Sequence, residues 1–321
     1  MNSKTRALTE ASLLTALICI IGLAGVYIPF VSIISYFTYA PLIVLGKRHG
    51  AKYTFVSLAA ASALFSLFTD PLTMLSLLLV SGISSAVMGA LFYYERTPAQ
   101  ILGAGILTAL ASAVVWIALA QMISGIQLLD AMKDMLDESF KLSQSMFGGM
   151  GQDPEQAAKA KELIETLKQQ MLMLFPAMIA IGAVFTAFLN YWFATLIFRK
   201  LRIAVPSLRP FREFELPRSI ILGTLLFYLL ALAVSALKIV DSEALMANIQ
   251  ILMIFTFAVQ GLAVAVWFMH RRSVSRGISI VAAVLLLMSN LGMTLLFMLG
   301  VIETAFHLRA RTEARNRQGG A

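Results

Sequence analysis

The sequence predicts an all-α fold: a polytopic bundle of eight or nine transmembrane helices, with an amphipathic helical hairpin outside the membrane. Of the 321 residues, 59% are hydrophobic and 13% are charged, which leaves too little polar surface for a soluble globule. Apolar runs close to the length that crosses a bilayer recur along the whole chain. The basic residues gather in the short loops between these runs, as the positive-inside rule describes.

The apolar runs define the predicted spans. They cover residues 8–28, 31–46, 53–69, 72–94, 99–122, 172–198, 218–238, 244–269 and 278–303. The second and third runs are short for a bilayer crossing, so we expect them to be tilted, interrupted or shielded by neighbouring helices. In the last run we favour one long helix over a hairpin, although Ser289-Asn290-Leu291-Gly292 near its middle could turn the chain back.

The loop charges orient the chain in a bacterial cytoplasmic membrane, with the N-terminus in the cytoplasm. The loops that define this side contain Lys4, Arg6, Lys47, Arg48, Lys52, Arg96, the segment from Arg199 to Arg218, Arg271, Arg272 and Arg276. A ninth full span would place the four arginines of the C-terminal tail outside, against the rule. The side of the C-terminus therefore depends on whether the last run is one helix or a hairpin.

The one long connection, residues 123–171, contains two amphipathic patterns separated by Gly148-Gly149-Met150-Gly151. The second pattern begins at Asp153-Pro154, a residue pair typical of a helix start. We expect an external helical hairpin whose second helix runs into the sixth span and bends near Pro176.

The sequence contains none of the usual patterns for chemistry. It has no GxxxxGK[ST] phosphate-binding loop, so any ATP-driven work would need a partner protein. No spacing of Cys, His or Asp predicts a metal site, and no cofactor is implied. No catalytic constellation is present, so we expect no enzyme. Because the basic residues serve topology, we expect no nucleic-acid partner.

Neutral polar residues within the spans are the candidates for binding a solute, because they are costly in lipid and should face the bundle. The candidate substrate-binding residues are Asp70, Ser81, Asn190, Asn248 and Gln260. Ser81 is of a residue type that mostly serves close helix packing, and the amides could equally join helices by hydrogen bonds. Asp70-Pro71 could instead cap the fourth span.

Two further features are candidate docking sites for a partner. Ala7, Ala11 and Thr15 recur every four residues and form a small-residue stripe, which could equally serve internal packing. The stretch RPFREFELP, residues 209–217, carries Arg209, Phe211, Arg212 and Phe214. The alternative for this stretch is an interfacial helix that holds the chain at lipid headgroups.

The segments ALTEASLLTAL, YIPF and APLIVLGKRHG resemble the opening of the substrate-capture subunits of energy-coupling-factor vitamin transporters. In that group a small-residue stripe on the first helix contacts the coupling subunit, and six helices form an outward-facing ligand pocket. The resemblance implies such a contact for Ala7 and Ala11, whereas Thr15 departs from alanine. It covers roughly residues 1–200, and the helices after residue 218 depart from a minimal capture subunit.

The whole chain looks like the YybS-like family of bacterial multi-pass membrane proteins. The same N-terminal pattern carries this resemblance, together with RPFREFELPR and with NIQILMIFTFAVQGLAVAVWFMHRR, which contains Asn248, Gln260 and Gly261. This resemblance implies no established substrate.

We therefore expect three parts: a six-helix module at residues 1–200 that includes the hairpin 123–171, a cytoplasmic interfacial elbow at 201–217, and additional membrane helices with a basic tail at 218–321. Two functions remain open. The first is a small-solute binding or transport subunit without its own ATPase, coupled to ATP-driven partner subunits. The second is a scaffold or regulator of the cell envelope, which would contact envelope proteins or membrane lipid through the external hairpin and the basic elbow.

Overall fold

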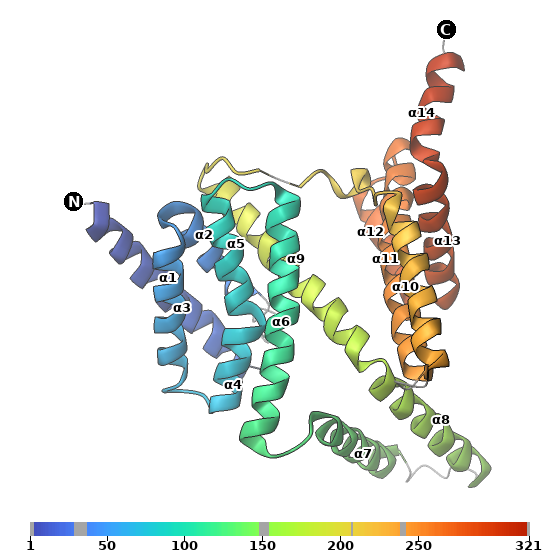
Figure 1. Ribbon diagram of the computed structural model, residues 1–321, viewed down its shortest axis with the longest axis horizontal. Helices are drawn as coiled ribbons and strands as arrows, with labels where there is room; N and C mark the ends of the chain where they lie inside the picture. Colours follow the sequence, from blue (N-terminus) through green and yellow to red (C-terminus); the bar gives the residue numbers. More distant parts are fainter. Residues whose placement is uncertain (1–2, 29–36, 148–153, 207, 238–241, 320–321) are drawn as a thin grey trace. The chain divides into compact units, whose positions relative to one another are not determined.

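The computed structural model describes residues 3–28, 37–147, 154–206, 208–237 and 242–319. Every regular element in these ranges is a helix, which confirms the all-α class. The chain divides into two compact units (Figure 1). We call them unit 1, Met1–Leu172 and Met178–Ser207, and unit 2, Met173–Ala177 and Leu208–Ala321.

Unit 1 is formed by the elements α1 (Ser3–Tyr27), α2 (Ala40–His49), α3 (Ala51–Phe65), α4 (Pro71–Ser76), η2 (Leu77–Ile83), α5 (Ser84–Tyr93), α6 (Pro98–Ser124), α7 (Leu128–Phe147), α8 (Pro154–Met173) and α9 (Phe175–Lys200). The junction of α8 and α9, Met173–Ala177, belongs to unit 2. The elements α4, η2 and α5 follow one another without a break and together have the length of one span. Thr97 and Gln100 form a reciprocal capping box at the start of α6, and Gly125 ends that helix in a left-handed conformation.

Helix α2 is the buried centre of unit 1. All residues from Ala40 to Gly46 are buried, and the helix contacts α1, α3 and α5. Its ten residues extend about 15 Å, about half of a hydrocarbon core. The described part of the second predicted span is therefore a core segment. An apolar helix of this length is tolerated at membrane depth because its neighbours cover it.

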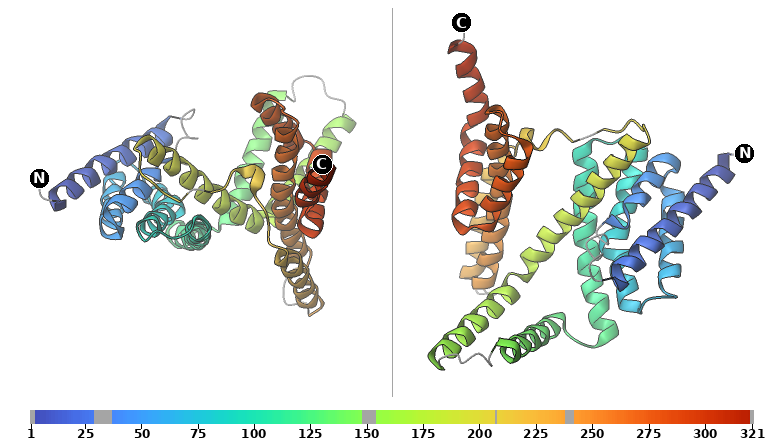
Figure 2. Two further views of the ribbon diagram at one scale, coloured as in Figure 1. Left: turned by 90° about the horizontal axis from the view of Figure 1, so that it is seen from above. Right: turned by 180° about the vertical axis from the view of Figure 1, so that it is seen from behind.

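Unit 2 contains η3 (Phe211–Glu213), α10 (Ser219–Ala236), α11 (Ser242–Arg271), α12 (Arg276–Met288), α13 (Asn290–Phe306) and α14 (Leu308–Gly319). Helix α11 is its centre and contacts α10, α12, α13 and η3. Figure 2 shows α11, α12 and α13 side by side from two further directions.

Six of the described helices are long and apolar enough to cross a membrane, and the number becomes seven if the bent pair α12 and α13 is counted as one span. The six are Lys4–Tyr27, Pro71–Tyr93, Pro98–Ser124, Phe175–Lys200, Ser219–Ala236 and Ser242–Arg271. Helix α3 is apolar but has only fifteen residues. A multi-pass architecture is thus present, whereas the exact count of eight or nine spans is not confirmed.

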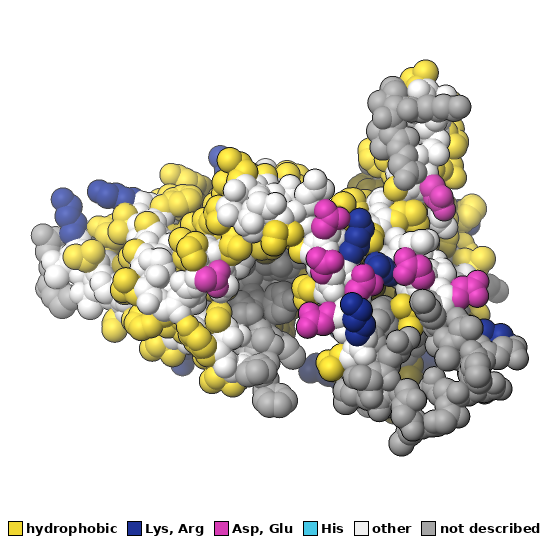
Figure 3. Space-filling view, turned by 90° about the horizontal axis from the view of Figure 1, so that it is seen from below, with side chains coloured by type: hydrophobic (Ala, Val, Ile, Leu, Met, Phe, Trp, Pro, Cys, Tyr) yellow, Lys and Arg dark blue, Asp and Glu magenta, His cyan; other side chains and the backbone are white. Residues whose placement is uncertain are grey.

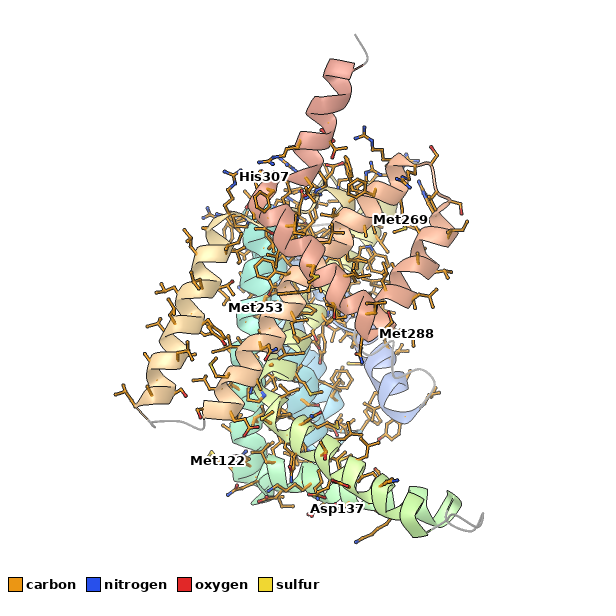
Figure 4. All side chains as sticks on the ribbon, turned by 90° about the vertical axis from the view of Figure 1, so that its right-hand side faces the viewer. Met122, Asp137, Met253, Met269, Met288 and His307 are labelled. Atoms are coloured by element: carbon orange, nitrogen blue, oxygen red, sulfur yellow. The ribbon has the colours of Figure 1, made fainter. Side chains whose placement is uncertain are left out.

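The last predicted span is two helices, and the expectation of one long helix is wrong. Helices α12 and α13 meet at a bend of 103°. At the bend, the Ser289 hydroxyl accepts a hydrogen bond of 3.0 Å from the N–H of Gly292. Such a cap starts a new helix, because it satisfies a backbone donor that has no partner within the helix. Met288 lies at the bend, whereas Met269 and His307 lie toward the other end of unit 2 (Figure 4).

The connection at 123–171 forms the two predicted amphipathic helices, α7 and α8. The Lys168 ammonium lies 2.7 Å from a carboxylate oxygen of Asp137 and joins the two helices. This hydrogen bond raises the pKa of the Lys168 side chain. Figure 3 shows acidic and basic side chains gathered together on the face viewed from below. The placement of this pair outside the membrane stays a prediction.

Helices α11 and α13 approach each other most closely at two glycines. A Cβ atom at Gly261 would lie 1.8 Å from the carbonyl oxygen of Leu296, and one at Gly300 would lie 1.8 Å from the carbonyl oxygen of Phe257. Neither position can hold a larger side chain unless the helices separate. Glycine therefore sets the distance between the two backbones.

We predict that Gly261→Ala destabilises the purified protein by about 1–3 kcal/mol, the usual cost of overpacking a core. Gly277→Ala on α12 is the matched control, because a Cβ at Gly277 meets no atom within 4 Å. Thermal unfolding in detergent measures both variants. Equal melting temperatures would contradict a tight contact between α11 and α13.

Candidate functional site

The predicted substrate-binding residues fall in both units: Asp70, Ser81 and Asn190 in unit 1, and Asn248 and Gln260 in unit 2. Ser81 is buried in η2. Asn190 is buried in α9, where its amide group donates a hydrogen bond of 2.9 Å to the carbonyl oxygen of Thr186 one turn earlier. These two residues lie inside the helical packing of unit 1.

Asp70 is exposed and caps the start of α4. One of its carboxylate oxygens accepts hydrogen bonds of 3.0 Å from the N–H groups of Leu72 and Thr73. Hydrogen bonds from Thr73, followed by that from Leu72, lower the pKa of the Asp70 carboxyl group. The cap therefore contributes fully above the ordinary pKa of an aspartate and weakens as the pH falls through the lowered value.

Asn248 completes the backbone hydrogen bonding where α8 ends and α9 begins. Its carbonyl oxygen accepts a hydrogen bond of 2.8 Å from the N–H of Ala177, and its amide group donates one of 2.7 Å to the carbonyl oxygen of Met173. In an unbroken helix, Ala177 would donate directly to Met173. Pro176 lies in this turn and prevents regular helical packing there. The side chain of Asn248 thus replaces the lost backbone hydrogen bond.

Gln260 performs a similar task for the RPFREFELP stretch. It is 1% exposed, and its side-chain carbonyl oxygen accepts a hydrogen bond of 3.0 Å from the N–H of Leu216. The stretch lacks regular helix on both sides of η3, so its backbone donors need partners from elsewhere. Gln260 supplies one from the buried face of α11.

Arg309 holds the same stretch from the other end of the chain. Its guanidinium lies 2.7 Å from a carboxylate oxygen of Glu303 and donates hydrogen bonds of 2.7 Å and 2.8 Å to the carbonyl oxygens of Arg212 and Phe214. The side chains of Arg309 and Glu303 are only 5% and 2% exposed. A buried charge pair of this kind is sustained by its additional hydrogen bonds.

Two aromatic rings remain on the outside of this immobilised backbone. Phe211 and Phe214 are 42% and 37% exposed. Their ring planes lie within 12° of parallel, with centroids 6.4 Å apart. Arg209 is exposed beside them, and Arg212 lies 3.8 Å from the Glu213 carboxylate. The stretch therefore presents an apolar pair flanked by arginines on a fixed backbone.

The small-residue stripe of α1 faces the interior of unit 1. Ala7, Ala11 and Thr15 are 3%, 5% and 6% exposed, and α1 contacts α2 and α3. This is the internal packing that the sequence left open as the alternative. In this arrangement a partner would contact other residues of α1, such as Leu8 and Leu13, which are exposed.

Ion pairs bring the basic loops of unit 1 to one end. The Glu10 carboxylate on α1 lies 2.9 Å from the Arg48 guanidinium and 2.7 Å from the His49 ring nitrogen at the end of α2. Lys47 lies 3.3 Å from Glu95 in the turn between α5 and α6. The N-terminal part of α1 and two connections that the sequence assigns to the cytoplasm therefore share one end of the unit.

Four buried hydroxyl groups in unit 1 are a feature that sequence reasoning missed. The hydroxyls of Thr38, Tyr39, Ser57 and Ser85 have no hydrogen-bond partner among the residues that the structure describes. They come from α3, α5 and the turn before α2, and α2, α3 and α5 pack against one another. The sequence gives no signal for these four residues, because hydroxyl side chains within apolar runs usually bond to the backbone of their own helix. Only their burial in the folded structure identifies them.

The geometry and composition define a multi-pass helical membrane protein. Among the described residues, no three His, Cys, Asp or Glu side chains are grouped as in a metal site. The chain belongs to the family described as "Predicted membrane protein (DUF2232)", whose model matches residues 16–304.

A relative in Bacillus subtilis (strain 168) bears the name "Uncharacterized protein YybS". The two chains are 26% identical over 314 residues, which cover 97% of this chain and 99% of the relative. The expected membership of a YybS-like membrane family is thus confirmed. No solved structure matches this chain.

We predict that Arg309→Gln destabilises the protein by about 3–5 kcal/mol, because it leaves the Glu303 carboxylate buried without its charged partner. The double variant Glu303→Gln with Arg309→Gln should recover part of this loss, since no buried charge remains. Arg311→Gln in α14 is the matched control. Unfolding in detergent measures the three variants, and equal effects of Arg309→Gln and Arg311→Gln would contradict the proposed importance of the pair.

Proposed function

We propose that unit 1 is a binding module for a small, neutral, polar solute and that the protein is a transport subunit without its own ATPase. The four buried hydroxyls at Thr38, Tyr39, Ser57 and Ser85 support this most directly. A buried hydroxyl without a partner loses the hydrogen bonds that it makes in water. A bound polar solute would supply them, and groups that both donate and accept suit an uncharged ligand.

The proposed topology places the N-terminus, the basic loops and the RPFREFELP stretch in the cytoplasm, with α7 and α8 outside. In this topology the cytoplasmic end of unit 1 meets an ATP-driven partner. The bend between α12 and α13 supports it, because after this bend Arg309 contacts the RPFREFELP stretch. A chain that turns back at Ser289 returns its basic tail to the cytoplasmic side, as the positive-inside rule requires.

The experiment compares two tyrosine variants in a solute screen. Tyr39→Phe removes a hydroxyl without a described partner, whereas Tyr191→Phe removes one that donates to the carbonyl oxygen of Pro206 at 3.2 Å. Without solute, we expect Tyr39→Phe to melt at or above the wild-type temperature and Tyr191→Phe to lose about 0.5–1.5 kcal/mol. A solute that stabilises the wild type should lose its effect on Tyr39→Phe and keep it on Tyr191→Phe.

Two outcomes would count against this function. If no vitamin-like or other small polar solute shifts the melting of the wild type, the module lacks the proposed ligand. If Tyr39→Phe is as destabilised as Tyr191→Phe without solute, the Tyr39 hydroxyl already has a partner such as buried water.

A second candidate function is a scaffold or regulator of the cell envelope that binds a protein through the RPFREFELP stretch. The observation that favours it is the backbone held by Arg309 and Gln260 beneath the exposed rings of Phe211 and Phe214. Rigid aromatic residues beside arginine are typical of the energetic centres of protein interfaces. An anchor in lipid headgroups would not require such a fixed backbone.

This candidate predicts that a photo-crosslinking residue at Phe211 yields one discrete protein adduct in cells. The same residue at Phe55, which is 44% exposed on α3, is the control and should not yield that adduct. Arg309→Gln should reduce the adduct at Phe211, because it releases the backbone that positions the rings. Adducts with lipid alone would instead assign the rings to the membrane interface.

A further inference from the structure

A groove between α10 and α11 lies outside every function proposed above. It has a volume of about 390 Å³ and is shallow and widely open to its surroundings. It is lined by Ser219, Gly223, Thr224 and Phe227 of α10 and by Met253 and Thr256 of α11, among others. Figure 4 labels Met253 on α11. Both helices are candidate membrane spans, so acyl chains are the solvent around them.

Apart from Ser219 at one end, the lining of the groove is apolar in effect despite its two threonines. The Thr224 hydroxyl donates a hydrogen bond of 2.6 Å to the carbonyl oxygen of Ile220, and the Thr256 hydroxyl donates one of 2.8 Å to that of Leu252. Each hydroxyl is thus satisfied within its own helix. A polar solute would find few hydrogen-bond partners in this groove. A hydrocarbon chain needs none, so it suits the lining better.

The groove has the dimensions of one acyl chain in one leaflet. On α10 it extends from Ser219 to Phe227, which is about 12 Å along a helix. One leaflet contributes about 15 Å of hydrocarbon. Gly223 leaves the space open, because a Cβ at this position meets no atom within 4 Å.

The end of the groove at Ser219 adjoins basic side chains. Arg218 directly precedes Ser219 and is exposed, and the RPFREFELP stretch before it presents Arg209. Basic residues next to a span attract anionic headgroups. Charge and shape therefore point to the same ligand, with its head near Arg218 and its tail along Gly223.

We propose that this groove binds one anionic phospholipid, with an acyl chain between α10 and α11 and the phosphate at Arg218. The site differs from the solute module in unit 1 and from the exposed phenylalanines. The lipid would extend the small contact area between α10 and its neighbours, since only 6% of the residues of α10 are buried within the protein.

The test is native mass spectrometry of the full-length protein in detergent, after incubation with equal amounts of dioleoyl phosphatidylglycerol and dioleoyl phosphatidylcholine. We expect the wild type to retain one phosphatidylglycerol preferentially. Gly223→Leu fills the groove and should reduce this retention by about tenfold or more. Arg218→Gln should reduce the preference for phosphatidylglycerol by about fivefold, the contribution of one basic residue near an anionic surface.

Gly103→Leu on α6 is the matched control, because a Cβ at Gly103 also meets no atom within 4 Å. It should retain the lipid like the wild type, which excludes a general effect of an added leucine on lipid binding. Equal lipid retention by the wild type and Gly223→Leu would overturn the proposal. So would a dimer of the wild type that Gly223→Leu disrupts without changing lipid retention, because a second copy would then occupy the groove.

Discussion

Backbone hydrogen bonding is the constraint on which the rest of this structure depends. A buried N–H or carbonyl group that leaves a helix needs another hydrogen-bond partner, and two irregular segments of this chain receive one from polar side chains within the protein. Asn248 completes the turn around Pro176, Gln260 holds Leu216, and Arg309 holds two carbonyl groups of the RPFREFELP stretch. These side chains therefore stabilise the backbone at the segments where it leaves regular helix.

The same constraint separates structural polar residues from candidates for function. In the sequence, an Asn or Gln within an apolar run looks the same whether its side chain binds a ligand or a backbone group of an irregular segment. The structure assigns backbone partners to Asn248 and Gln260 in unit 2. It leaves the hydroxyls of Tyr39 and Ser85 in unit 1 without a described partner. The binding proposal therefore rests on residues different from those that polarity alone selects.

The basic C-terminal tail illustrates how one local turn affects the whole topology. A straight last helix would carry Arg309 away from the RPFREFELP stretch, and the tail would oppose the charge rule. The cap at Ser289 starts a second helix instead, and the close contact of Gly261 with Gly300 lays it along α11. The return of the chain brings Glu303 and Arg309 to the stretch that they stabilise.

The sequence by itself determined the membrane class, the helical content and most helix positions, because composition and apolar length are local properties. The YybS-like family was indicated by the resemblance of particular segments, such as RPFREFELPR. It also indicated the amphipathic pair α7 and α8 and the break near Pro176. Only the tertiary structure decided that α2 is a buried core helix, that the stripe of Ala7 and Ala11 faces inward, and that α12 and α13 are two helices that meet at a bend of 103°. It alone also joined Arg309 to the RPFREFELP stretch. These features depend on contacts between residues far apart in the chain, and a single sequence records no such distances.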